Sequence, residues 1–208
     1  MLSASLSGFG LGLSLIVAIG AQNLFVLRQG IRREHALLVA TICALSDAVL
    51  IIAGVTGLGL VVQSVPWLVP VVRWAGAAFL LAYGLMAARR AWRPSGQALD
   101  AQAAGDRGAA APPARRATVV LTCLALTWLN PHVYLDTVFL LGSIAATHGD
   151  NRSWFAVGAV AASAAWFFAL AFGARLLGRV LATPRAWRVL DGFVALVMIL
   201  LAVSLVWP

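Results

Sequence analysis

The chain has 208 residues, of which 62% are hydrophobic and only 11% are charged, and its formal net charge at pH 7 is +8. A soluble domain is roughly half apolar and about a quarter charged, so this composition excludes an ordinary soluble protein and indicates a membrane protein. All fifteen basic residues are arginine, and the two cysteines, Cys43 and Cys123, lie in apolar runs without a CxxC motif or a Cys/His cluster. This cysteine pattern predicts two buried small side chains rather than a disulfide framework or a metal site.

Six apolar runs are long enough to cross a bilayer, which takes roughly 20 mostly apolar residues in a helix. They cover approximately residues 5–27, 36–63, 67–88, 117–142, 154–174 and 189–207. None alternates with a period of two, so we expect an all-α membrane protein with six transmembrane helices. The first charge in the chain is Arg28, which follows the first run, so this run lacks the basic start of a secretory signal and is expected to be a retained span.

The arginines are unevenly distributed among the connections between the runs. Thirteen of them, with Arg28 included, fall in the first, third and fifth connections, whereas Arg152 alone falls in the others. Positive charge favours the cytoplasmic side of a membrane, so we expect those three connections inside the cell and both termini outside. The basic charge is then explained by topology and anionic lipid, and not by nucleic-acid binding.

The connection over residues 91–116 is rich in Ala, Gly and Pro, which predicts a flexible cytoplasmic linker. It separates two halves, residues 1–90 and 117–208, with three runs each. Because three is odd, two equivalent halves must have opposite orientations, which is the inverted-repeat layout of many secondary transporters. The corresponding residues would be Asn23 with Asn130, Ser46 with Ser163, and Arg73 and Gly76 with Arg188 and Gly192.

Two carboxylates within the apolar runs stand out, because a charge there costs roughly 2.5–3.5 kcal/mol on insertion scales. Asp47 falls near the middle of the second run; it is either a structural ion pair or, as we favour, a substrate or proton site. Arg73 is a candidate partner, although its side chain could equally extend to the outer surface. Asp136 follows Asn130 by six residues, about 9 Å along a regular helix, and is either a second functional carboxylate or an interfacial acid.

Two of the runs contain signals for a broken helix. Pro131 removes a backbone donor and clashes with the preceding turn, so the fourth run is expected to kink or break there. The freed carbonyls then need partners, which Asn130 can supply. Gly20, followed by the amides of Gln22 and Asn23, predicts a similar loosening in the first run. Broken helices offer backbone amides to anions and carbonyls to cations, which suits a zwitterionic amino acid. The alternative is a kink that only shapes packing.

Glycines recur in "GFGLG" at 8–12 and "GVTGLG" at 54–59. No strand precedes either segment and both lie in apolar runs, so they predict close helix packing rather than a nucleotide-binding loop.

Three segments together resemble the LysE family of amino-acid exporters, in particular its lysine/arginine branch. They are "GAQNLFVLRQGIRREHALL" at 20–38, "SDAVLI" at 46–51 and "LNPHVYLDTVFLLGS" at 129–143. The likeness covers nearly the whole chain in order, apart from the linker, and "GAQN" stands where the neutral amino-acid branch typically has a "PGPN"-like motif. The resemblance implies a multi-pass secondary transporter of the bacterial cytoplasmic membrane, with no enzymatic activity and no cofactor. It would export arginine, lysine or both, in antiport with protons.

The resemblance also implies functional roles for six matching residues, which are Gln22, Asn23, Asp47, Asn130, Pro131 and Asp136. Four further residues are supporting candidates: Ser46, Arg73, Tyr134 and His132, the last as a proton relay or a structural histidine.

We expect a site near mid-membrane between the halves, lined by the first, second and fourth spans. There Asn23 and Asn130 would hold the substrate backbone, and Asp47 or Asp136 would face its side-chain cation. Protonation of Asp47 would couple export to the proton gradient.

The expected partners are the amino acid, protons and the lipid bilayer, and the chain is compatible with a homo-oligomer. Two other functions stay open. One is the same machine carrying neutral amino acids. The other is a membrane thiol electron carrier that uses Cys43 and Cys123.

Overall fold

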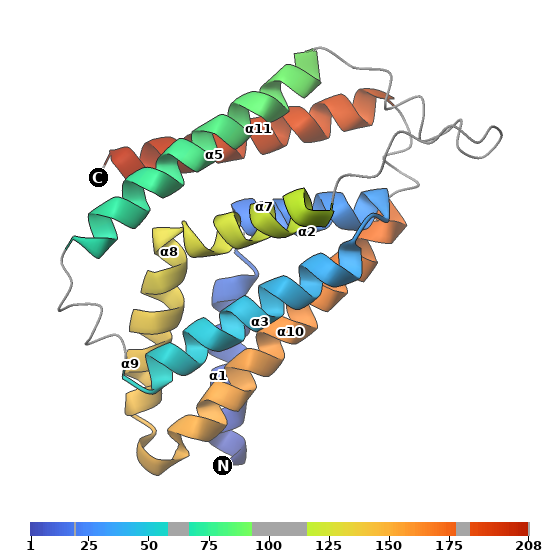
Figure 1. Ribbon diagram of the computed structural model, residues 1–208. Coiled ribbons are helices and arrows are strands. Elements are labelled where there is room, and N and C mark those ends of the chain that lie inside the picture. The colour runs from blue at the N-terminus through green and yellow to red at the C-terminus, as the bar shows by residue number, and fades with distance from the viewer. Residues whose placement is uncertain (19, 58–66, 93–115, 178–183, 208) are drawn as a thin grey trace.

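The computed structural model in Figure 1 describes residues 1–18, 20–57, 67–92, 116–177 and 184–207, and every regular element within these ranges is helical. Four helices are long and apolar enough to cross a membrane alone. They are α3 (Ala36–Val55), α5 (Leu68–Trp92), α10 (Arg152–Leu177) and α11 (Pro184–Val206). The prediction of an all-α membrane protein is therefore confirmed.

Two further apolar segments are broken helices, at the places where the sequence predicts breaks. α1 (Leu2–Ile16) and α2 (Ala21–Arg32) meet at a bend of 82°. α7 (Arg116–Trp128) is followed after a bend of 57° by α8 (Pro131–Val133), the π-helix η1 (Tyr134–Leu140) and α9 (Leu141–Ala146). The short 3-10 helix η2 (Gly149–Asn151) then leads into α10. Counting each bent pair as one span brings the four spans to as many as six.

The boundaries differ from the predicted runs at several ends. The second run was expected to reach residue 63, but α3 ends at Val55, and residues 58–66 lie outside the described part of the chain. Most of the predicted linker, residues 93–115, also lies outside it. α5 continues to Trp92 and α11 begins at Pro184, so arginines assigned to connections, such as Arg90 and Arg188, lie on helix ends.

The helices form two layers that are joined by α2 and α7 (Figure 1). α5 and α11 pack along each other in one layer, and α10 packs against α1 and α3 in the other. Arg73 of α5 donates hydrogen bonds to the backbone carbonyl oxygens of Leu205 and Val206. The last carbonyls of a helix have no partner within it, so Arg73 holds the end of α11 against α5. It is not the partner of Asp47, which corrects the pairing considered from the sequence.

Glycines allow the closest helix contacts, as predicted. A Cβ added to Gly12 of α1 would lie 3.1 Å from the Cα of Ala159 in α10, and one added to Gly54 of α3 would lie 2.5 Å from the carbonyl oxygen of Thr137 in η1. Gly57 differs, because no atom lies within 4 Å of its added Cβ; its φ of +89° places it in the region that favours glycine. It follows the end of α3 rather than packing a helix pair.

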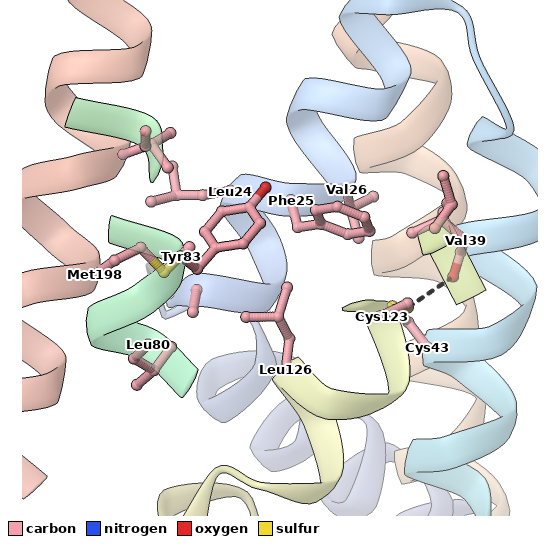
Figure 2. Packing of buried hydrophobic residues seen from close by; sticks show 14 of the residues in the cluster. Leu24, Phe25, Val26, Val39, Cys43, Leu80, Tyr83, Cys123, Leu126 and Met198 are labelled. Carbon is pink, nitrogen blue, oxygen red and sulfur yellow. Dashed lines mark hydrogen bonds between the residues drawn. The ribbon is translucent and has the colours of Figure 1, made fainter. Parts of the chain in front are cut away.

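The largest apolar cluster connects the two layers (Figure 2). Leu24, Phe25 and Val26 of α2 lie between Tyr83 of α5 and Val39 of α3, and the Phe25 and Tyr83 rings meet edge to face at 6.3 Å. Cys43 and Cys123 belong to this cluster and are fully buried, as predicted. Their sulfur atoms lie 3.3 Å apart, although the two residues are 80 positions apart in the sequence, so no local pattern could predict this contact.

Candidate functional site

Asp47 of α3 is buried, with 4% of its surface exposed. Ser163 Oγ of α10 donates a hydrogen bond of 2.8 Å to its Oδ2. A carboxylate can accept about four hydrogen bonds, and the described residues supply this one. Burying an isolated charge is unfavourable unless it is paired, so Asp47 offers a place where a proton or a cation would be stabilised.

The break in the first span is held by Asn23. Its Nδ2 donates to the carbonyl oxygens of Ile16 at 2.8 Å and Ala18 at 2.7 Å, where α1 has ended and its last carbonyls lack partners. Its Oδ1 accepts a hydrogen bond of 3.2 Å from Trp166 Nε1 of α10. The neighbouring Gln22 is buried, and its Nε2 has no hydrogen-bond partner among the described residues. The first break therefore contains one buried amide donor without a hydrogen bond from the described residues.

The break in the fourth span is held by Asn130 and Tyr134. Asn130 caps α8, because its Oδ1 accepts a hydrogen bond of 3.1 Å from the backbone N–H of His132, and Pro131 occupies the first helical position. Tyr134 Oη donates to the carbonyl oxygen of Trp128 at 2.8 Å, which closes the gap from the other side. Asn130 therefore acts at the break, but it bonds a backbone N–H and not a freed carbonyl as predicted; the carbonyl is bonded by Tyr134. The His132 side chain is exposed.

Asp136 lies in the π-helix η1 and is partly exposed. It forms no hydrogen bond or ion pair with a described residue. The distance expected from Asn130 assumed a regular α-helix, and the π-helical turn makes that assumption wrong. Wider turns of this kind occur frequently at functional sites, so Asp136 stays a candidate on a different geometric basis.

The polar residues come from four spans rather than the three that were expected. Trp128 Nε1 of α7 donates to Ser46 Oγ of α3 at 3.3 Å, next to Asp47. The fifth span adds Ser163 and Trp166, which sequence reasoning did not assign to the site. Ser163 is noted in the sequence only as the counterpart of Ser46, and its spacing of three residues from Trp166, which places both on one helix face, is the signal that was missed.

A second buried polar cluster lies at the end of the helices that carries the arginines. Arg28 Nη1 of α2 lies 2.9 Å from Asp191 Oδ1 of α11, and both side chains are almost fully buried. Arg28 was counted as a loop charge, which is wrong, because it lies within α2 and faces α11. Asp191 is an acidic residue inside the sixth apolar run, and this position in the sequence is the signal that could have identified it as a candidate site residue.

The arrangement contains broken helices and a buried carboxylate, and comparison with known proteins identifies its family. The LysE type translocator family matches residues 13–207. The chain belongs to the LysE family. It is 46% identical to the arginine exporter protein ArgO of Yersinia enterocolitica over 206 residues, which cover 99% of this chain and 97% of that protein.

Other relatives support the same assignment. The ArgO protein of Serratia proteamaculans is 46% identical over 208 residues, covering 100% of this chain and 98% of its own. A "Putative amino-acid transporter" of Mycobacterium tuberculosis is 50% identical over 191 residues, covering 92% of this chain and 90% of its own. No solved structure matches the chain. This LysE family member is thus a multi-pass transport protein of the bacterial cytoplasmic membrane and not an enzyme, as expected.

Proposed function

We propose that this protein exports basic amino acids, arginine or lysine or both, in exchange for protons. The observation that carries the proposal is the buried Asp47 carboxylate with a single hydrogen bond from the described residues. A cationic side chain or a proton can each neutralise it, and the two cannot do so together. The likeness to two arginine exporters over nearly the full chain favours a basic cargo.

The proposed transport cycle uses the two helix breaks beside this carboxylate. Gln22 Nε2 and the amide groups at the start of α2 would bind the cargo carboxylate, since the N-terminal end of a helix favours anions. Asn23 and Asn130 would position the broken ends, and Asp47 would bind the side-chain cation. Asp136, partly exposed in η1, would receive or release the proton. Release of cargo would be followed by protonation of Asp47, which links export to the proton-motive force.

The proposed architecture is six spans in two inverted halves, residues 1–90 and 117–208, with both termini outside the cell. The contacts between helices support it, because they recur when the halves are exchanged. Exchanging the halves makes α1 correspond to α7, α2 to η1 and α9, α3 to α10, and α5 to α11. The contact of α2 with α10 then corresponds to the contact of η1 and α9 with α3, and the contact of α1 with α10 corresponds to that of α7 with α3. The contacts of α3 with α10 and of α5 with α11 are unchanged by the exchange. Such exchange is the pattern of inverted-repeat transporters.

The test is Asp47→Asn in proteoliposomes that contain labelled arginine. We expect efflux to be lost while the protein remains inserted, because the amide keeps the size of the side chain but can neither bind a cation by charge nor titrate. Asp150→Asn is the matched control, since Asp150 is exposed in η2, and it should leave efflux unchanged. Wild-type efflux from Asp47→Asn would overturn the role of this carboxylate.

A further inference from the structure

Asp191 of α11 is paired with two arginines that are held very differently. Arg28 approaches at 2.9 Å and has 7% of its side chain exposed, whereas Arg90 Nε lies 3.5 Å away and 35% of its side chain is exposed. Arg90 Nε and Nη2 are buried atoms that form no hydrogen bond with a described residue, and the same holds for Asp191 Oδ1, the atom that both arginines face. The two arginines differ in distance and in side-chain exposure, so Arg28 is the close, buried partner of Asp191 and Arg90 is the more distant, more exposed one.

The place that Arg90 occupies is suited to a guanidinium or an alkylammonium group. Asp191 supplies negative charge on one side, and the Arg90 guanidinium carbon lies 5.8 Å from the centroid of the buried Tyr83 ring. A carboxylate together with an aromatic face is a favourable environment for an organic cation. The cargo proposed above carries a cation of the same chemistry as the Arg90 side chain.

Exchange of one cation for another at Asp191 would leave the buried charge unchanged. The Asp191 carboxylate would keep Arg28 and lose Arg90, whose partly exposed side chain can return to water. The large penalty for creating an unpaired buried charge is thereby avoided. Such an exchange needs no new cavity for the cation itself, because the cargo group replaces a group of the same kind.

The position also suits an uptake site for an exporter. Arg90 is in the last turn of α5, beside Arg89, and Asp191 lies near the start of α11. These helix ends carry the arginines that favour the cytoplasmic side, which is the side from which an exporter takes its cargo.

We propose that Asp191 is a binding subsite for the side-chain cation of the cargo, and that Arg90 is a built-in competitor that the cargo displaces. This inference rests on the proposed function for the identity of the cargo. It adds a further carboxylate to the pathway, distinct from Asp47 and Asp136 and located at its cytoplasmic end.

The test is the equilibrium dissociation constant of labelled L-arginine for the purified full-length protein, in an Asp47→Asn background that removes the central carboxylate. Arg90→Gln should lower the constant about two- to five-fold, because the competitor is a partly exposed ion pair of modest strength. Arg89→Gln is the matched control, since it removes the same charge from an exposed neighbour, and it should leave the constant unchanged.

Asp191→Asn alone would leave Arg28 buried without its partner, so the loss of the subsite is tested in the double variant Arg28→Gln/Asp191→Asn. This variant removes both buried charges together and should raise the dissociation constant roughly tenfold or more. A structural ion pair predicts changes of the same sign in Arg90→Gln and in the double variant, whereas a competitor and its subsite predict changes of opposite sign.

Changes of the same sign, an equal effect of Arg89→Gln and Arg90→Gln, or an unchanged constant in the double variant would each overturn the inference. Efflux from wild-type proteoliposomes separates this result from the proposed function. Arginine efflux with unchanged binding in the variants refutes only the subsite. Opposite shifts in binding without any wild-type efflux refute only the transport proposal.

Discussion

Ser163→Ala should impair export strongly, although Ser163 is not itself expected to touch the cargo. The substitution removes the Oγ atom that donates the 2.8 Å hydrogen bond to Asp47 Oδ2, at a position with no exposed surface. It leaves the carboxylate without a hydrogen-bond donor among the described residues and changes the packing volume little. Hydrogen bonds to charged groups contribute about 1.5–3 kcal/mol, and each 1.4 kcal/mol is a factor of about ten. Steps that need the charged carboxylate in this position should therefore slow by roughly 10- to 150-fold.

The assay is the initial rate of arginine efflux from proteoliposomes that contain equal amounts of inserted protein. Ser204→Ala is the matched control, because Ser204 is exposed in α11 and its Oγ donates a hydrogen bond of 2.9 Å to a carbonyl of its own helix, that of Leu201. This control should stay within about twofold of the wild-type rate, as surface substitutions usually have small effects. A wild-type rate from Ser163→Ala would refute the reasoning, since the hydrogen bond would then play no part in positioning Asp47 for transport.

Three further predictions test the packing, the thiols and the second helix break. Gly142→Ala should destabilise the protein by about 1–3 kcal/mol and lower its melting temperature, because the new Cβ would lie 2.6 Å from the Gly54 carbonyl oxygen, whereas Gly192→Ala, with no atom within 4 Å, should not; equal melting temperatures would contradict this. Cys43→Ala/Cys123→Ala should retain efflux, because both thiols are fully buried, whereas a redox carrier needs accessible, reactive thiols. Loss of efflux from well-inserted protein would instead favour thiol chemistry. Asn130→Ala should remove a helix cap that contributes about 1 kcal/mol and reduce efflux, and an unchanged rate and melting temperature would show that the break needs no cap.

Local features of the sequence were sufficient to predict four apolar helices and the two helix breaks. Hydropathy over about 20 residues depends on composition alone, and Pro131 ends a helix by its own covalent structure. The side chain of Asn130 then has a partner two residues away, the backbone N–H of His132, so both groups of this interaction lie within one short stretch of sequence. The same reasoning placed Asn23 at the first break.

Contacts between spans could not be predicted in this way. Asp47 lies 116 residues from Ser163 in the chain, so neither local propensity nor hydropathy distinguishes Ser163 from Arg73 as its partner. Arg28 looked like a loop charge because it follows an apolar run, yet the turn of α2 directs it towards Asp191. The π-helical turn at Asp136, which packs against α3, was likewise not predicted from the sequence.

The central claim is the export of basic amino acids coupled to protons, and a substrate panel tests it most directly. Proteoliposomes would be loaded with labelled arginine, lysine or threonine, and efflux would be measured with and without an imposed pH gradient. We predict efflux of arginine, lysine or both, which becomes faster when the pH gradient drives protons in the direction opposite to cargo movement. We predict no comparable efflux of threonine. Efflux of threonine alone would contradict the basic cargo, and efflux of arginine that ignores the gradient would contradict proton coupling.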